Sequence, residues 1–155
     1  MIKTIIFYML CAFSVNSFAA VDYFYIKDTG GEKVKVKIRD LETLSSKSVK
    51  TETIYTGEEI FTGVLIKEIF KKYKIKGNYV RAFAWDDYSY SVSVDELEKC
   101  DVILAYKQSG EYMKIENHGP FAIIYPKGVC PELNTLDINA KTVMQVKLLE
   151  VRENE

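Results

Sequence analysis

Hydrophobic and polar residues alternate along much of the chain, which is the pattern of half-buried β-strands. Between residues 33 and 38, lysines alternate with Val and Ile, and the segment at 21–26 places aromatic residues in a similar pattern. A turn cluster, Asp-Thr-Gly-Gly at 28–31, separates the two and predicts a hairpin. In total, we predict strands at 21–26, 33–38, 48–55, 79–85, 89–94, 102–106, 112–115, 121–125 and 142–151.

Helical spacing of apolar residues is clearest between residues 65 and 73. We predict a helix there, capped by Thr62 and preceded by a loop at 57–60. Shorter helical turns are predicted from Asp40 to Leu44 and at the acidic segment 95–98, and a long loop is predicted after residue 125. Because strands and helices do not alternate regularly, a doubly wound parallel sheet is disfavoured. We predict an α+β domain with a mixed, curled or barrel-like β-sheet and two or three short helices.

The first 19 residues have the features of a secretory signal peptide. Lys3 precedes an apolar stretch at 4–15, and Ser17 and Ala19 are small residues at positions −3 and −1 of the expected cleavage site. We therefore expect a periplasmic protein whose single domain covers residues 20–155. An uncleaved N-terminal anchor is the alternative.

The charge and the cysteine content narrow the possible functions. The 155-residue chain has a formal charge of −1, so nucleic acid is disfavoured as a partner. His118 is the only histidine, and we interpret it as a surface residue of a loop. After export the chain keeps Cys100 and Cys130. An oxidising compartment favours a disulfide between them, and two buried free thiols are the alternative.

Residues 84–88, Ala-Trp-Asp-Asp-Tyr, place two carboxylates between aromatic residues at the end of a strand. An Asx turn with a solvated carboxylate is the simplest interpretation of this segment. The functional interpretation is an anionic acceptor beside flat aromatic walls. Such a site suits a planar heterocycle whose edge carries N–H donors, because a carboxylate accepts charge-assisted hydrogen bonds and aromatic rings supply stacking area.

This segment is one of several that resemble, in order, those of a known family. The others are the Thr-x-aromatic step at 53–55, the Phe-Thr-Gly-Val-Leu run at 61–65, the Ile-Leu-Ala-Tyr run at 103–106, and the most specific one, Gly-Pro-Phe-Ala-Ile-Ile-Tyr-Pro at 119–126. The chain resembles the small exported proteins with the sulfite oxidase type of molybdopterin-binding fold. The resemblance extends from Thr53 to Val151.

The chain departs from this family at the metal ligand. Sulfite oxidases hold molybdenum through a Cys thiolate after the strand that precedes the Gly-Val helix, and here Thr53 or a near neighbour takes that place. A hydroxyl is too weakly acidic to replace a thiolate on a soft metal. Tyr55 and the pair Met144-Gln145 replace two usual Trp residues. The resemblance therefore implies a pterin-shaped pocket with no metal and no enzymatic redox chemistry.

Non-catalytic exported members of the family resemble periplasmic pterin-binding regulators of the PruR type. Those bind a pterin and act on the periplasmic domain of a membrane enzyme that makes or degrades cyclic-di-GMP. The resemblance implies that this chain is such a sensor, with a pterin and a membrane signalling protein as its partners. The alternatives are a molybdopterin-dependent oxidoreductase subunit and an interaction module without a ligand.

The sensor interpretation assigns roles to six residues. We expect Asp86 to accept hydrogen bonds from the amino group and the N3–H edge of the pterin. The remaining ligand contacts expected are stacking or wall contacts from Tyr55, Phe61 and Tyr88, a hydroxyl from Thr53, and a polar rim contact from Arg81.

Overall fold

The computed structural model describes residues 21–126, 128–131, 133 and 135–155. The signal peptide expected at 1–19 lies outside these residues, so its cleavage stays a prediction. In the part of the chain that the structure describes, no helix is long and apolar enough to span a membrane.

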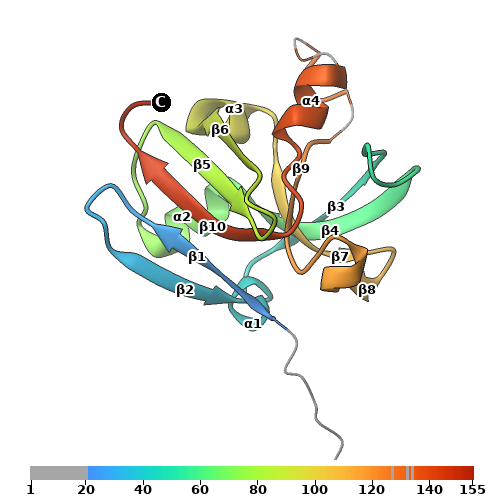
Figure 1. The fold of residues 1–155 in the computed structure, drawn as a ribbon, viewed down its shortest axis with the longest axis horizontal. Helices are drawn as coiled ribbons and strands as arrows, with labels where there is room; N and C mark the ends of the chain where they lie inside the picture. The colour runs from blue at the N-terminus through green and yellow to red at the C-terminus, as the bar shows by residue number, and fades with distance from the viewer. Residues whose placement is uncertain (1–20, 127, 132, 134) are drawn as a thin grey trace, which may run out of the picture.

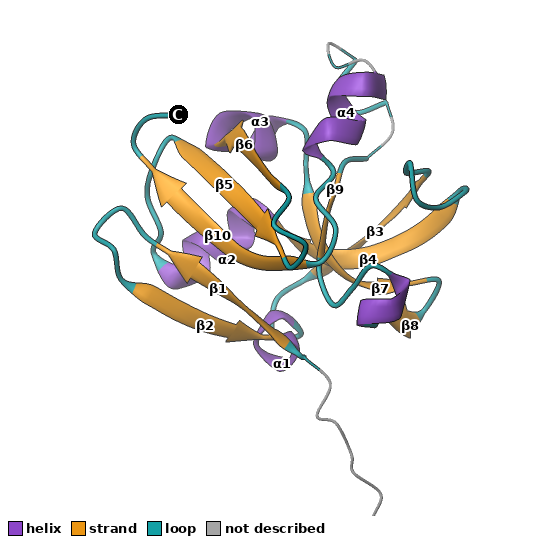
Figure 2. Cartoon of the chain, in the orientation of Figure 1, coloured by secondary structure: helices purple, strands orange, loops and turns teal. Residues whose placement is uncertain are grey.

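The first sheet is mixed and forms the front layer in Figures 1 and 2. Its strand order is β2 (Lys33–Lys37), β1 (Tyr23–Lys27), β10 (Val146–Arg152), β5 (Tyr79–Ala84) and β6 (Ser89–Ser93). β1 and β10 are parallel, whereas the other neighbours are antiparallel. Residues along these strands alternate between buried and partly exposed, so one face of the sheet covers the core and the other faces outward.

The second sheet is antiparallel and centres on β7 (Ile103–Gln108). One edge of β7 pairs with β4 (Glu59–Leu65), which in turn pairs with β3 (Ser46–Thr51). The other edge is shared by β9 (Ala122–Ile124) and the two-residue β8 (Glu111–Tyr112). β7 lies between two hydrophobic clusters. Leu104 and Tyr106 belong to the main core, while Ile103 and Ala105 belong to a smaller cluster with Phe61.

Short helices connect the strands. They are α1 (Ile38–Leu41), α2 (Ile66–Tyr73), α3 (Val94–Lys99), α4 (Thr135–Lys141) and a 3-10 turn at Ile115–Asn117. α2 lies behind the first sheet in Figure 2 and buries Ile66, Ile69 and Phe70 in the main core. The hydroxyl of Ser93 caps α3 by accepting the amide hydrogen of Glu96. The α+β class and the mixed sheet predicted from the sequence are confirmed, and the strands lie in two sheets.

The structure corrects the expectation of a helix cap at Thr62. The loop predicted at 57–60 ends earlier than expected, because β4 already begins at Glu59, and α2 begins only at Ile66. The hydroxyl of Thr62 instead lies 2.9 Å from that of Ser48 on the neighbouring strand. Pairing of β4 with both β3 and β7 outweighs the local preference of this segment for a loop and a cap.

Two later segments also differ from the prediction. The long loop expected after residue 125 contains α4, and of the strand expected at 112–115 only Tyr112 is extended. Both elements are short, and α4 contacts β6. Tertiary contacts therefore decide their conformation more than local sequence does.

The predicted disulfide between Cys100 and Cys130 is present, with the two Cα atoms 5.3 Å apart. It joins the end of α3 to the segment before α4. Glu96 of α3 adds two contacts in the same region. Its Oε1 accepts from the Tyr125 hydroxyl at 2.8 Å, and its Oε2 pairs with Lys141 Nζ at 2.7 Å. α3 therefore holds the segment from β9 to the end of α4.

Replacing Gly63 with Ala should destabilise the protein by about 1–3 kcal/mol. A Cβ at this position would overlap the carbonyl oxygen of Leu104 and lie 2.5 Å from Ala105 Cα, and these backbone atoms of β7 cannot rotate aside. Gly57→Ala is the matched control, because a Cβ there meets no atom within 4 Å. Urea unfolding measures both variants. Equal free energies of unfolding would contradict the close packing of β4 on β7.

Removing the disulfide by the double change Cys100→Ala and Cys130→Ala should lower the free energy of unfolding by up to about 3–4 kcal/mol. The reason is that the crosslink, between residues 30 positions apart, restricts the unfolded chain. Urea unfolding with and without reductant measures the loss. Titration of the denatured, unreduced wild type should find no reactive thiol from this pair, and two per chain would contradict the bond.

Stability should decrease above about pH 10 in a way that depends on Tyr125. Burial, and then the carboxylate of Glu96, raise the pKa of Tyr125 far above its ordinary value. The folded state keeps this proton while the unfolded state releases it, so the stabilising contribution is complete below about pH 10 and is lost as the pH rises, at about 1.4 kcal/mol per pH unit. Tyr125→Phe should therefore show a shallower alkaline slope in urea unfolding. Identical slopes would refute this assignment.

Candidate functional site

The turn between β5 and β6 carries the two adjacent carboxylates. The amide of Ala84 donates to the carbonyl of Tyr88 at 2.8 Å, which closes the hairpin. Asp86 Oδ1 accepts the amide hydrogen of Tyr88 at 3.1 Å, so the Asx turn considered for this segment is present. Within the described residues this is the only hydrogen bond of the Asp86 side chain, and Oδ2 accepts none. Asp87 instead pairs with Lys147, with Oδ1 and Nζ 2.9 Å apart.

Backbone hydrogen bonds join this turn to two other loops. The amide of Trp85 donates to the carbonyl of Gln145 at 3.0 Å, and the amide of Gln145 donates to the carbonyl of His118 at 3.1 Å. Asp87, His118 and Gln145 all have positive φ angles, of 68°, 61° and 53°. A non-glycine residue in this left-handed backbone conformation is strained by about 1 kcal/mol or more, and strained residues of this kind often occur at functional sites. Residues with positive φ also occur elsewhere, at Lys74, Asp101 and Ser109. The candidate site is therefore assigned from the three loops that backbone hydrogen bonds hold beside Asp86.

Aromatic side chains surround the joined loops, and we call them the aromatic rim: Tyr55, Trp85, Tyr88 and His118. The rings of Tyr55 and His118 have centroids 5.0 Å apart and an interplanar angle of 33°. Tyr88 donates its hydroxyl to the carbonyl of Ala140, at the end of α4, at 2.7 Å. Burial, and then the neighbouring Tyr55 and Tyr90, raise the pKa of Tyr88, so Tyr88 remains a neutral donor up to alkaline pH.

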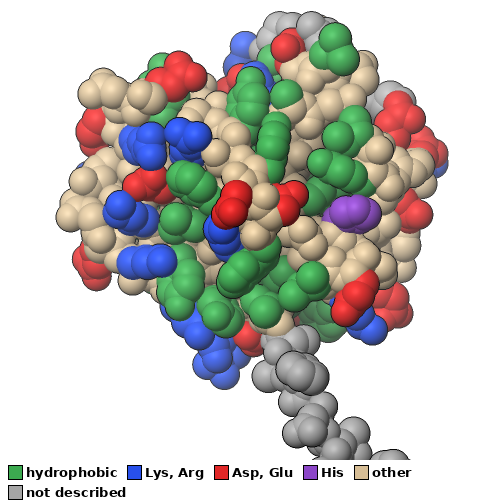
Figure 3. Space-filling model, viewed as in Figure 1, with side chains coloured by type: hydrophobic (Ala, Val, Ile, Leu, Met, Phe, Trp, Pro, Cys, Tyr) green, Lys and Arg blue, Asp and Glu red, His purple; other side chains and the backbone are tan. Residues whose placement is uncertain are grey.

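The rim is accessible to a ligand. Tyr55, Trp85 and Tyr88 are each 42–49% exposed, so part of each ring is open to solvent. In Figure 3, hydrophobic side chains gather in the middle of the molecular face, and the purple imidazole lies beside them. Exposed rings beside a carboxylate oxygen without a donor can stack on and hydrogen-bond to a flat polar molecule.

The structure gathers some of the predicted site residues and not others. Asp86, Tyr88 and Tyr55 lie at or beside the rim. Thr53 lies in the loop that carries Tyr55, but its hydroxyl oxygen accepts the amides of Tyr55 and Thr56, both at 3.1 Å, and so shapes the loop. This geometry gives Thr53 a local structural role.

Phe61 and Arg81 lie away from the rim. Phe61 is fully buried in the smaller hydrophobic cluster, so it supports the second sheet from inside and offers no exposed wall. Arg81 points from β5 to the outer face of the first sheet, where its guanidinium donates two hydrogen bonds to Ser89.

Two residues of the region were missed by sequence reasoning. The sequence predicts a surface loop residue at His118, yet its side chain is half-buried and its ring packs at a tilt against that of Tyr55. Its position before Gly119, at the start of the most family-like segment, is the signal that pointed to it. The pair Met144-Gln145 was noted only as the replacement of a usual Trp. The role of Gln145 comes from its backbone and from a side-chain amide that donates to the carbonyl of Ile115 at 3.0 Å.

The described residues also form two cavities elsewhere. One lies between α1 and residues 112–116, and the other lies beside the hairpin turn that follows β1. Neither is lined by any of the six predicted ligand-binding residues.

Comparison with known proteins agrees with this fold. The crystal structure of the sulfane dehydrogenase SoxCD from Paracoccus pantotrophus is similar, with a TM-score of 0.64 and 15% sequence identity. The alignment covers 86% of this chain and 38% of that chain, so the chain spans well under half of the SoxCD chain. No curated protein matches the sequence. The profile of the oxidoreductase molybdopterin binding domain matches residues 27–132. This chain belongs to the oxidoreductase molybdopterin-binding domain family.

Proposed function

We propose that this chain is an exported pterin-binding sensor without enzyme activity. The observation that carries the proposal is the combination of an accessible aromatic rim with the loss of a thiolate ligand. Membership of the family supports the pterin half of the proposal, because the family is described as binding molybdopterin. The residues of the site decide how much of that cofactor fits.

The molybdenum half of the cofactor does not fit the described residues. Cys100 and Cys130 are joined to each other, so neither sulfur is available as a thiolate. Thr53, near the position expected for the ligand, uses its hydroxyl within its own loop. We therefore derive no redox step for this chain.

A metal-free pterin fits the remaining chemistry better. Its flat bicyclic ring needs aromatic surface, which the rim supplies, and its amino and N–H edge needs an acceptor. Asp86 offers Oδ2 for this purpose while Oδ1 maintains the turn. The Gln145 backbone, fixed between Trp85 and His118, keeps the loops in place without a ligand, so less ordering is needed on binding.

The signalling role is the finer part of the proposal, and the sequence resemblance supports it. On this proposal, pterin occupancy is communicated to the periplasmic domain of a membrane enzyme that makes or degrades cyclic-di-GMP, as in PruR-type regulators. A molybdopterin-dependent oxidoreductase subunit is the second candidate, favoured by the family description. The paired cysteines weigh against it.

Asp86→Asn should weaken pterin binding by about 10- to 150-fold, because an ionised acceptor of N–H groups contributes about 1.5–3 kcal/mol. The Asn side chain keeps an oxygen for the Asx turn, so the change tests the charge and the second acceptor and leaves the loop intact. Titration of neopterin into the wild type and the variant, followed by pterin fluorescence, measures the affinities.

Asp87→Asn is the matched control for this experiment. It changes the adjacent carboxylate, which is committed to Lys147, and should alter the affinity far less. Loss of binding in Asp87→Asn alone would mean that the wrong carboxylate was chosen. A wild type that binds no neopterin would favour an interaction module without a ligand.

A further inference from the structure

The outer face of the first sheet is strongly basic. Residues of its strands that point away from the core include Lys27, Lys33, Lys35, Lys37, Arg81 and Arg152, against a single carboxylate, Glu150. We call this surface the basic face. With Lys147 of β10 left out, because it is paired with Asp87, the basic face has a formal charge of +5. The whole chain has −1, so the remaining residues together carry −6. This separation of charge over one sheet gives the molecule a directional electrostatic field.

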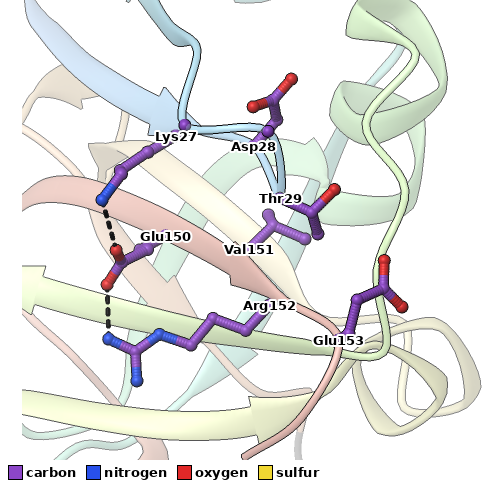
Figure 4. Close-up of a pocket in the computed structure, with 9 residues that line it drawn as sticks. Lys27, Asp28, Thr29, Glu150, Val151, Arg152 and Glu153 are labelled. Carbon is purple, nitrogen blue, oxygen red and sulfur yellow. Dashed lines mark hydrogen bonds and ion pairs between the residues drawn. The ribbon is translucent and has the colours of Figure 1, made fainter.

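The one carboxylate on the basic face is fully engaged. Figure 4 shows Glu150 between Lys27 and Arg152, with Oε1 2.8 Å from Lys27 Nζ and Oε2 2.6 Å from the Arg152 guanidinium. These two cations lower the pKa of Glu150, so it stays ionised and already neutralised. No carboxylate of the described residues pairs with Lys33 or Lys35.

Aromatic rings lie among these cations. Lys35 Nζ is 3.6 Å from the centroid of the Tyr23 ring, and Lys33 Nζ is 4.2 Å from that of Tyr25. The register then places Tyr25 beside Leu148, and Leu148 beside Phe83, in a row across the middle of the sheet. In Figure 3, cations lie on the left of the view, next to a centre of hydrophobic side chains with acidic ones among them. An apolar centre with a charged border is typical of protein interfaces.

Edge protection explains only part of this pattern. Lysines on β2, an edge strand, discourage pairing with other strands. Edge protection does not require Arg81 and Arg152 on inner strands, nor a row of Tyr25, Leu148 and Phe83 across the sheet. No helix lies in front of β1, β10 and β5 in Figures 1 and 2. Cations on inner strands around an apolar row are the features expected of a sheet face that binds another molecule.

We propose that the basic face is the docking surface for an acidic face of a partner protein. The acidic character of the partner follows from charge complementarity with the basic face. Its identity as the extracytoplasmic domain of a membrane protein rests on the proposed sensor function. The partner supplies carboxylates opposite Lys33 and Lys35 and apolar side chains opposite the central row.

Protein is favoured over a lipid surface by the shape of the face. The ammonium groups of Lys33 and Lys35 lie over the rings of Tyr25 and Tyr23, and the apolar row is half-buried. Membrane-binding surfaces instead insert protruding apolar groups into the lipid. A second copy of this chain is the other occupant to exclude, since the rest of the chain is acidic.

Photo-crosslinking from the centre of the face tests the proposal. The photoreactive residue p-benzoylphenylalanine replaces Phe83 in the full chain, and crosslinking is carried out in the cells that produce the protein. In the control, p-benzoylphenylalanine replaces Ile60, which is 47% exposed on the second sheet. We expect a protein adduct from position 83 only. The captured protein is identified by mass spectrometry, and its purified extracytoplasmic domain is then titrated with variants of this chain.

The double variant Lys33→Glu with Lys35→Glu should weaken that binding by about 10-fold or more, with a strong dependence on salt. The matched control is Lys71→Glu with Lys76→Glu, which reverses the same charge at exposed positions on and after α2 and should bind like the wild type. Neopterin affinity should be unchanged in both, because the rim lies outside the basic face.

Several results would overturn the proposal. These are no adduct at position 83, equal adducts at positions 83 and 60, an adduct with a second copy of this chain, or equal binding by the two double variants. Sedimentation with phosphatidylglycerol vesicles that depends on Lys33 and Lys35, without a protein adduct, would assign the face to a membrane surface. A docked partner combined with no neopterin binding by the wild type would preserve the docking surface and refute the sensor function.

Discussion

The bond between Cys100 and Cys130 is the constraint on which the site depends. It attaches the end of α3 to the segment before α4, and the contacts of Glu96 with Tyr125 and Lys141 fasten the rest of that segment. α4 then presents the carbonyl of Ala140 to the hydroxyl of Tyr88. The same bond removes both described thiols from metal chemistry. This covalent link therefore supports, through α4, the position of the Tyr88 side chain, and it engages both cysteine sulfurs of the described residues.

The candidate site is built from loops whose strain the remainder of the fold offsets. Asp87, His118 and Gln145 adopt left-handed conformations, and the backbone bonds from Trp85 to Gln145 and from Gln145 to His118 hold them together. Each loop is anchored by a strand of one of the two sheets. A rim fixed in this way would lose little conformational entropy on binding a rigid planar ligand.

Sequence patterns predicted the elements with strong local signals. Alternation in the 33–38 segment located β2, and helical spacing located α2, although not its start. The error at Thr62 arose because pairing of β4 with two neighbours is a long-range effect, and the close approach of β7 to Gly63 is visible only in three dimensions. The parallel pairing of β1 with β10 likewise joins the two ends of the chain.

The candidate site, like the fold, was predictable from the sequence only where its residues are close together in the chain. The carboxylate–aromatic turn was found because its residues are adjacent in the sequence, and Asp86 both forms the Asx turn and keeps an acceptor for other donors. His118 and Gln145 were missed because their roles depend on contacts with residues far away in the sequence. Phe61 begins one of the family-like segments, but its side chain points into the smaller hydrophobic cluster, and the resemblance alone did not show this direction.

The central claim is that the fold keeps a pterin site and has lost the metal. The most direct measurement is the ligand content of the protein purified after export, with pterin fluorescence read after denaturation and molybdenum measured by elemental analysis. We predict a stoichiometric pterin and no molybdenum. Stoichiometric molybdenum in the purified protein would contradict this account and identify the chain as an oxidoreductase subunit.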